Sequence, residues 1–352
     1  MDKATGFGNQ TRFLSNALSS AGHEVVVAGA GGVFTNGDVK QHFINHLDAK
    51  ELDFLIEVES PDVCIVFSFL NDVLALSYSR HLVRKIPCFF WVAWESDVIP
   101  QEFRHTLDKW PSESIVHLTR HAKDLWGIGD NYIPHAVDTT LFKPTTDRKS
   151  LRESLSRRLG VPIHDDGILL LNVDRNDNRK RWDLTYDLLS RLRDRLGKRV
   201  QLIAHTSESS VEGYNHGLLM DLYDVRDLVI HTGCDRLTKA GWSPEEYADL
   251  FAMSDIRIST SSGEGFGIPT LEAYASGCVN IVPHNTCQPE VARGSTVRCG
   301  NRNFSRGLLW DDVDVGAMAS VIENLVKSPS QMNLSVEEGL ERINEEYPEE
   351  RV

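Results

Sequence analysis

The sequence predicts an α/β protein with parallel sheets in two domains, and three observations support this prediction. The chain has 352 residues, which is too long for one typical hydrophobic core. Short apolar runs such as Ile168–Val173 alternate with helical patterns, as expected of buried parallel strands. Residues 132–144 contain two prolines and a turn, which is typical of an interdomain connector. We therefore expect domains at residues 1–145 and 146–352.

Composition and charge exclude several classes of function. The net charge of −14 disfavours a protein whose main task is to bind nucleic acid or an anionic membrane. The 6 cysteines include no C-x-x-C pair, and most lie in or beside apolar runs, which indicates buried thiols in a reducing compartment. No stretch approaches about 18 uninterrupted apolar residues, and the N-terminus shows no signal-peptide pattern. We expect a cytoplasmic protein.

The N-terminal segment predicts a glycine loop that opens a helix. Gly6–Arg12 precedes an amphipathic pattern, and residues 24–28 (EVVVA) follow as a buried strand. A glycine loop of this kind is also typical of a dinucleotide site. However, Thr11 replaces the third glycine of G-x-G-x-x-G, and no acidic residue ends the strand. The pattern therefore disfavours NAD binding.

Further apolar runs and helical patterns complete the first half of the chain. Open α/β sheets bind ligands at the carboxyl ends of their strands. The strand expected at 87–93 ends in Trp94-Glu95-Ser96-Asp97, so Glu95 is a candidate for that edge, and a simple loop acid is the alternative. The other elements expected here are strands at 63–67 and 114–118 and helices at 73–84 and 119–125.

The second half repeats the alternation of strands and helices. Ile168–Val173 is expected to be a buried strand, and the basic segment 174–181 (DRNDNRKR) follows directly at its carboxyl end. An arginine and a lysine at a strand tip neutralise the charge that grows on a leaving diphosphate, and a solvated charge run is the alternative. Further elements are expected at residues 182–196, 200–204, 228–231 and 243–252.

Residues 254–292 carry the strongest functional signal. A strand at 256–258 leads into the turn Glu264-Gly265-Phe266-Gly267, and a helix begins near Thr270. A strand, a glycine-rich turn and a helix N-terminus together present backbone N–H groups and a positive dipole end to phosphate. Glu264 and Glu272 flank the turn, and carboxylates are good acceptors for sugar hydroxyls. The segment therefore predicts a site for a nucleotide sugar.

The segment E-G-F-G-I-P-T-L-E-A-Y-A-S-G-C resembles the E-x7-E motif of retaining GT-B glycosyltransferases of family four. Residues 132–144 are similar to the family's connector I-P-N-G-V-D-x-x-x-F-x-P, and residues 174–181 are similar to its G-R-x-x-x-x-K-G segment. The resemblance implies a GT-B fold, in which two Rossmann-like domains face a cleft. It also implies transfer of a hexose from a UDP-, GDP- or ADP-sugar to a hydroxyl acceptor with retention at the anomeric carbon, without a cofactor or a metal.

The same resemblance implies roles for individual residues. Arg175 and Lys180 have the spacing of the pair that holds the donor diphosphate, and Arg179 is a further candidate beside Lys180. Glu264 is expected to bind hydroxyls of the transferred sugar, and Glu272 the ribose of the nucleotide. The remaining candidates are Gly265, Phe266 and Gly267 for sugar and phosphate, Thr270 and Leu271 for the diphosphate, Gly233 for the nucleobase, Gly8 for donor phosphates or the acceptor, and Glu95 for the acceptor.

Two departures from the family pattern accompany this resemblance. The family has a strand before the first glycine loop and a last helix that crosses back onto the first domain, and we expect both to be missing here. Alternative functions are a sugar-nucleotide epimerase or hydrolase on the same fold, or a non-catalytic or truncated GT-B subunit. The expected partners are a nucleotide-sugar donor and a glycan, a glycolipid or another hydroxyl acceptor. The acidic first domain disfavours duplex DNA, and no feature supports membrane contact.

Overall fold

The computed structural model describes residues 6–29, 39–44, 48–76, 79, 81–82, 86–108, 110–233, 242–305 and 308–347. The chain divides into two compact units, one of residues 1–136 with 349–352 and the other of residues 137–348. This division precedes the boundary that we expected after residue 145, because the connector packs with the second unit. The Phe142 ring contacts Phe251 and Tyr247 of α9 (Pro244–Met253), with ring centroids 5.6 and 6.0 Å apart.

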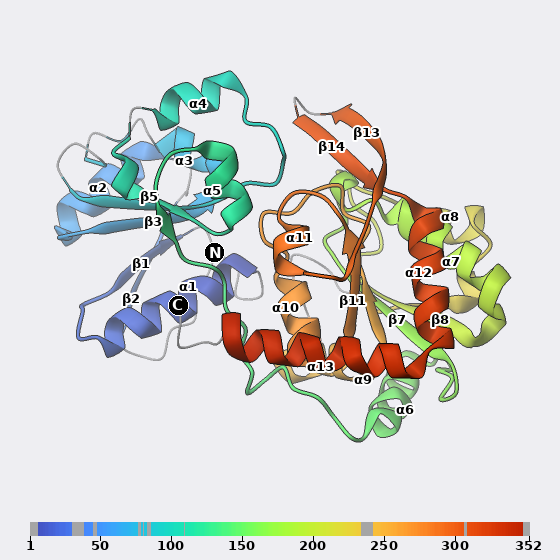
Figure 1. Ribbon diagram of the computed structural model, residues 1–352. Coiled ribbons are helices and arrows are strands. Elements are labelled where there is room, and N and C mark those ends of the chain that lie inside the picture. The colour runs from blue at the N-terminus through green and yellow to red at the C-terminus, as the bar shows by residue number, and fades with distance from the viewer. Residues whose placement is uncertain are drawn as a thin grey trace. The chain divides into compact units, whose positions relative to one another are not determined.

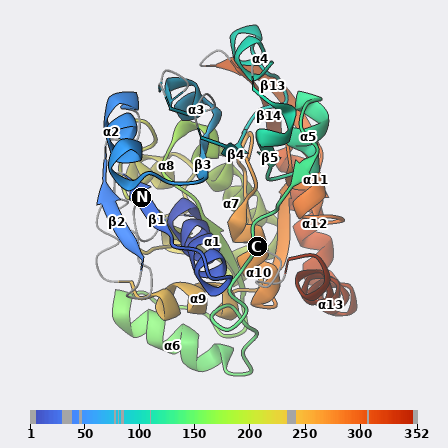
Figure 2. The same cartoon turned by 90° about the vertical axis from the view of Figure 1, so that its left-hand side faces the viewer.

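The first unit is built on a parallel sheet. Its strands lie side by side in chain order: β3 (Cys64–Phe69), β4 (Cys88–Ala93), β5 (Ile115–His117) and β6 (Asn131–Tyr132). A separate parallel pair consists of β1 (Val26–Gly29) and β2 (Lys40–Phe43). Figure 2 shows this unit with its described helices α1 (Gly6–Ser20), α2 (Ala49–Glu59), α3 (Leu70–Leu76), α4 (Gln101–Leu107) and α5 (Arg120–Trp126).

Helix α1 begins earlier than the sequence suggested. The segment that we expected to form a glycine loop is helical from Gly6 onward, so the prediction of a loop around Gly8 is wrong. Two hydrogen bonds hold the helix, from Gln10 Nε2 to Ala136 O at 2.9 Å and from Ala136 N to Gln10 Oε1 at 3.2 Å. The Phe7 ring also packs on Phe67 of β3, with centroids 4.6 Å apart. These contacts favour helix over loop. Residues 1–5, which precede it, lie outside the described residues.

The second unit contains a parallel sheet in the order β12-β11-β10-β7-β8-β9. Figure 1 labels β7, β8 and β11 of this sheet. The bounds of its strands are β7 (Ile168–Val173), β8 (Val200–His205), β9 (Val229–His231), β10 (Ile256–Ile258), β11 (Val279–Pro283) and β12 (Thr296–Val297). The chain starts at the centre with β7, adds β8 and β9 on one side, and then returns to add β10, β11 and β12 on the other. The direction of strand addition therefore reverses between β7 and β10.

Helices cover both faces of this sheet. On one face, α7 (Trp182–Leu196) and α12 (Val315–Lys327) pack together over a core that contains Leu189 and Ile322. The bounds predicted for β7 and α7 are confirmed to the residue. The other described helices of the unit are α6 (Arg148–Leu159), α8 (His216–Leu222), α9, α10 (Ile268–Ala275), α11 (Gln288–Val291) and α13 (Pro329–Glu346). None of the helices in the described ranges is long and apolar enough to cross a membrane.

An antiparallel hairpin was not predicted from the sequence. It consists of β13 (Cys299–Ser305) and β14 (Leu308–Val313), which Figure 1 shows projecting from the second unit. A cross-strand ion pair joins Arg302 Nε to Asp311 Oδ1 at 2.7 Å. Charged and polar residues that suggest a loop in the sequence therefore form paired strands.

Candidate active site

Two strand tips meet where the order of the sheet reverses. β7 and β10 are paired directly, while β8 extends the sheet on one side and β11 on the other. Open α/β sheets bind ligands at the carboxyl ends of their strands at such a switch point. Residues 174–181 follow β7 and residues 259–264 follow β10. Both functional segments that the sequence singled out therefore lie at this position.

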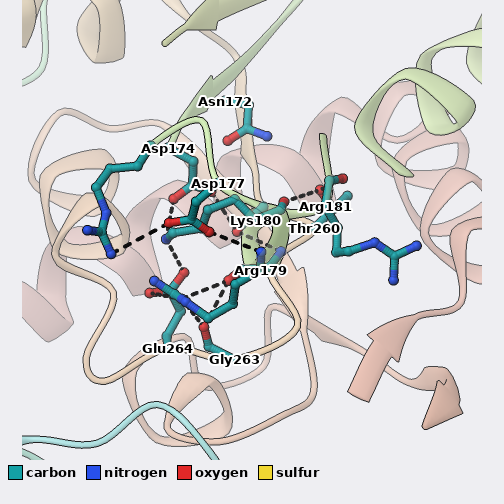
Figure 3. A network of polar contacts seen from close by, with 12 residues as sticks. Asn172, Asp174, Asp177, Arg179, Lys180, Arg181, Thr260, Gly263 and Glu264 are labelled. Carbon is teal, nitrogen blue, oxygen red and sulfur yellow. Dashed lines mark hydrogen bonds and ion pairs between the residues drawn. The ribbon is translucent and has the colours of Figure 1, made fainter. Parts of the chain in front are cut away.

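Lys180 lies at the centre of a buried ion network at the switch point (Figure 3). Its Nζ lies 2.5 Å from Asp174 Oδ1 and 2.5 Å from Glu264 Oε1. Arg179 Nη1 lies 3.4 Å from Glu264 Oε2 and donates a hydrogen bond to Ser261 Oγ at 3.2 Å. Because Asp174, Lys180 and Glu264 are only 6–8% exposed, these charges interact more strongly than they would in water.

The backbone conformation of residues 177–181 directs the two cations of this network. Asp177 caps the 3-10 turn Asn178–Lys180 by accepting a hydrogen bond from Arg179 N at 3.0 Å. Arg181 then adopts a left-handed φ of 51°, and Thr260 Oγ1 donates to Lys180 O at 3.1 Å. A left-handed conformation costs an arginine about 1 kcal/mol, a strain that is typical of functional sites. The turn thereby directs the Arg179 and Lys180 side chains toward the segment that follows β10.

Glu264 is held in its ionised form. Burial alone raises the pKa of its carboxyl, but the charges of Lys180 and Arg179 outweigh burial and lower that pKa to about 2. Asp174 accepts a further hydrogen bond from Ser259 Oγ at 3.1 Å. The network contains two carboxylates and two cations, so its charges balance. A buried carboxylate whose pKa is shifted by specific cations at a sheet switch point is typical of a functional site.

The structure places Arg175 differently from the other predicted cations. Its side chain is 40% exposed, and its Nη2 lies 3.6 Å from Asp177 Oδ2. Among the described residues, Arg175 forms no ion pair with Glu264, which Arg179 and Lys180 contact instead. Arg175 lies in the same segment after β7 as the other two cations. Its contact with a diphosphate stays a prediction.

The glycine turn leads into helix α10 as the sequence predicted. Gly267 occupies the N-cap position with a φ of 85°, a left-handed conformation that glycine adopts without a steric penalty. No side chain of the described residues forms a capping hydrogen bond at the first turn, so the amide groups and the positive dipole end of α10 carry no such cap there. Thr270 Oγ1 accepts a hydrogen bond from the buried Arg257 Nη1 at 3.1 Å. Phe266 is buried, and its ring faces Tyr347 with centroids 6.0 Å apart.

Glu272 lies on α10 and is tied to the neighbouring helix. Tyr247 of α9 donates a hydrogen bond from its hydroxyl to Glu272 Oε2 at 2.9 Å. Burial, and next the Glu272 charge, raise the pKa of Tyr247 well above its usual value, so the hydroxyl stays protonated as a donor. Glu272 is 5% exposed, and the adjacent Leu271 is fully buried.

Three predicted residues are not members of this ion network. Gly233 follows β9, and its N–H donates to His231 Nδ1 at 3.1 Å, so a contact with a nucleobase through that N–H would have to replace this bond. Glu95 follows β4 in the first unit and is half-buried, while Gly8 is buried within α1. Their predicted ligand contacts stay predictions.

Sequence reasoning missed two carboxylates of the site. Asp174 forms one of the two ion pairs of Lys180. Its position directly after the buried strand β7 could have marked it as a site residue. Asp312 pairs with Arg181 and accepts a hydrogen bond from Ser262 Oγ at 2.6 Å. Because Asp312 lies in the unpredicted hairpin, no local pattern pointed to it.

Comparison with curated proteins gives two partial matches, and no protein-family model matches the chain. An MMP α-(1→4)-mannosyltransferase from Mycolicibacterium hassiacum is 27% identical over 215 residues, which cover 61% of this chain and 44% of that protein. A D-inositol 3-phosphate glycosyltransferase from Corynebacterium aurimucosum is 30% identical over 151 residues, which cover 40% of this chain and 32% of that protein. The matched part of the chain thus spans less than half the length of these relatives.

Solved structures are similar over nearly the whole chain. A glycosyltransferase from Rickettsia africae has a TM-score of 0.72 at 16% identity and covers 99% of this chain and 92% of its own. Anabaena HepE, in complex with UDP and glucose, has a TM-score of 0.71 at 11% identity and covers 99% of this chain and 94% of its own. At such identities the likeness concerns the fold. The predicted GT-B fold, mixed α/β with two Rossmann-like domains, is confirmed.

Proposed function

We propose that this chain is a retaining glycosyltransferase, which moves a hexose from a nucleoside-diphosphate sugar to an acceptor hydroxyl. The observation that carries the proposal is the buried pairing of Glu264 with Lys180 and Arg179, at the switch point and next to the uncapped start of α10. Cations and helix amides suit a diphosphate, and a carboxylate suits sugar hydroxyls. The names of the two curated relatives, both sugar transferases, agree with this proposal.

The donor has to displace an existing interaction in order to bind. Lys180 and Arg179 already hold Glu264, so the diphosphate competes with a carboxylate for the same two cations. When the phosphate takes the cations, Glu264 becomes available to accept hydrogen bonds from the transferred sugar. Binding of the diphosphate and binding of the sugar are thereby coupled. The cations exchange Glu264 for phosphate, and Glu264 exchanges the cations for sugar hydroxyls.

The chemical step then needs charge stabilisation and positioning from the protein. The bond between the anomeric carbon and the phosphate oxygen breaks, and a bond from the acceptor oxygen to that carbon forms on the same face. The proton of the acceptor hydroxyl moves to the departing phosphate oxygen. Lys180, Arg179 and the amides at the start of α10 stabilise the charge that grows on the diphosphate. Glu272 is proposed to bind the ribose, with Tyr247 fixing its orientation.

The chain's chemistry also bears on partner and compartment. Two buried thiols, Cys88 and Cys278, have pKa values raised by burial, and for Cys278 the value is about 12. Both are free cysteines, and free buried thiols are typical of proteins in reducing compartments, which supports the proposed cytoplasmic location. The proposed acceptor is a glycan, a glycolipid or another hydroxyl compound. HepE binds UDP and glucose on the same fold, which is consistent with a nucleotide-sugar donor.

A ligand screen tests the proposal directly. We expect UDP, GDP or ADP, or a sugar conjugate of one of them, to raise the unfolding temperature, because a ligand that binds the native state stabilises it by about 2.7 kcal/mol at 100 times its Kd. Lys180→Ala and Glu272→Ala should weaken that ligand at least tenfold, whereas Arg191→Ala, which removes a surface ion pair with Asp187, should not.

The outcomes of this screen separate the alternatives. Transfer of sugar to an added acceptor supports the proposal. Full-rate release of nucleoside diphosphate without an acceptor would indicate a hydrolase or epimerase, and binding without any turnover would indicate a non-catalytic subunit. A wild-type protein that none of these nucleotides stabilises would contradict the proposed function altogether.

A further inference from the structure

Thr286 has a strained backbone next to the proposed sugar-binding carboxylate. Its φ is 43°, in the left-handed region that β-branched residues strongly avoid. The other non-glycine residues of the described ranges with positive φ are Ser60, Arg181 and Asp224, and none of them is β-branched. Thr286 is also 7% exposed, so the strain is held inside the protein. Strain of this kind persists only where the surrounding structure enforces it, and it concentrates at functional sites.

The Thr286 hydroxyl contacts the backbone of Glu264. Glu264 N donates a hydrogen bond to Thr286 Oγ1 at 2.9 Å, and both groups are buried. The neighbours of Thr286 hold the same loop: Asn285 Nδ2 donates to Ser261 O at 3.0 Å, and Cys287 Sγ donates to Glu264 O at 3.1 Å. We call residues 285–287 the Asn285–Cys287 clamp. It fixes the main chain of Glu264 on both its N–H and its carbonyl.

The Asn285–Cys287 clamp holds Glu264 independently of the two cations. In the structure the Glu264 carboxylate is held by Lys180 and Arg179, and its backbone is held by the clamp. If a diphosphate takes the two cations, as proposed above, the carboxylate loses its charged partners and keeps the Ser261 side chain. The position of Glu264 then depends on Ser261 and on its backbone contacts, among which the Thr286 hydroxyl is the acceptor for its N–H.

We propose that Thr286 is a positioning residue, which holds the Glu264 main chain so that the released carboxylate meets the hydroxyls of the transferred sugar. This inference rests on the proposed function and deepens it. It explains why a hydroxyl-bearing residue, and not glycine, occupies this left-handed position: a glycine would relieve the backbone strain but would remove the hydroxyl that accepts the Glu264 N–H. Thr286 acts through Glu264 and does not itself touch the donor.

Three substitutions of Thr286 separate the hydroxyl from the backbone strain. Thr286→Ser keeps the hydroxyl, Thr286→Val keeps the β-branched shape without it, and Thr286→Gly removes both the hydroxyl and the strain. Thr296→Val is the matched control, because that half-buried hydroxyl hydrogen-bonds Nδ1 of the exposed His284 at 2.9 Å in the same unit. All four variants are made in the full chain, and each is checked for folding by thermal unfolding.

The measurement is the ratio of the Kd for a sugar nucleotide to the Kd for its nucleotide, by calorimetry. The probes are UDP-glucose with UDP, GDP-mannose with GDP and ADP-glucose with ADP, and the pair that wild type binds most tightly is then used for the variants. We expect Thr286→Val and Thr286→Gly to shift this ratio about tenfold against the sugar nucleotide, the effect of one lost hydrogen bond. The Kd for the nucleotide should stay within about twofold, because the phosphate contacts are unchanged.

The remaining results decide the inference. Thr286→Ser and Thr296→Val should retain the wild-type ratio, and Thr286→Gly should unfold at a higher temperature than Thr286→Val. An unchanged ratio in a folded Thr286→Gly protein would overturn the positioning role, as would an equal loss of affinity for sugar nucleotide and nucleotide, which a merely structural contact predicts. If wild type binds none of the six probes, the proposed function fails first, and this inference fails with it.

Discussion

At the scale of single residues, the site depends on one lysine held between two carboxylates. Lys180 contacts Asp174 and Glu264 at equal distances of 2.5 Å in a region with little solvent. Removing one member of such a network leaves a buried charge without its partner, which costs more than the pair contributes when intact. Substitutions in this network therefore affect both stability and ligand binding, and the two effects have to be measured separately.

Glu264→Gln provides a test through the pH dependence of stability. The pKa of Glu264 is lowered to about 2 in the folded protein, from 4.5 in the unfolded chain. Its contribution to stability is therefore present above about pH 4.5 and is lost as the pH falls toward 2. We expect the free energy of unfolding of wild type to fall more steeply between pH 5 and pH 3 than that of Glu264→Gln, in urea titrations. Parallel curves for the two proteins would show that Lys180 and Arg179 do not hold this carboxylate in solution.

The separation of the site residues along the chain explains which parts of the site could be predicted from the sequence. The glycine turn and its two glutamates are local, so their pattern was visible and the structure has the expected turn and helix. The pairing of Lys180 with Glu264 was not visible, because the two residues are 84 positions apart and meet through strand pairing. Similarly, the sequence favoured Arg175 by its spacing, whereas the turn geometry brings Arg179 onto Glu264.

At the scale of elements, the start of helix α10 depends on one glycine. Gly267 has a φ of 85°, and a Cβ there would lie 3.5 Å from the Gln288 amide, at ordinary contact distance. A substitution to alanine therefore meets backbone strain and little steric clash. The proposed diphosphate site uses the amides that this turn presents, so the effect should extend from stability to binding.

Gly267→Ala and Gly294→Ala form a matched pair for this test. Both glycines have left-handed φ, 85° and 79°, but Gly294 is exposed, with open space around its position and no ligand role. We expect each substitution to lower the free energy of unfolding by about 1–2 kcal/mol. Only Gly267→Ala should also weaken the nucleotide, by tenfold or more in calorimetry. Equal nucleotide affinity in both variants would contradict the role proposed for this turn.

The hairpin β13–β14 shows why some elements are invisible in a sequence. Its strands carry Arg302, Asn303, Asp311 and Asp312, which lack the apolar alternation that predicts a strand. They are stable as strands because opposite charges face each other across the pair and because Asn303 Nδ2 donates to Asp312 Oδ2 at 2.8 Å. Pairing partners, which no local pattern contains, decide the structure of this segment.

At the scale of the whole molecule, the sheet order of the second unit positions the chemistry. Because β10 returns to pair with β7, the segments that follow these strands become neighbours although about 80 residues separate them. A ligand at the switch point should therefore stabilise the segments after β7 and β10 together. It should stabilise them more than it stabilises the edge of the sheet at β12.

Hydrogen exchange measures this expectation. With the nucleotide from the ligand screen at saturation, we expect the largest gains in protection at residues 174–181 and 259–272. The edge strand β12, which carries no predicted ligand residue, should change little, since local opening there does not involve the site. The Lys180→Ala variant at the same nucleotide concentration serves as the control and should show smaller gains. Gains spread evenly over the second unit would contradict a ligand at the switch point.

The sequence by itself determined the fold class, the bounds of β7 and α7, and the glycine turn that opens α10, because hydrophobic periodicity, proline and glycine act over a few residues. Only the tertiary structure decided that Gly6–Arg12 is helical, that Arg179 and not Arg175 faces Glu264, and that Asp174 and Thr286 belong to the site. Each of these depends on contacts between segments far apart in the chain. Such contacts arise from the order in which strands pair, and a local pattern does not contain that order.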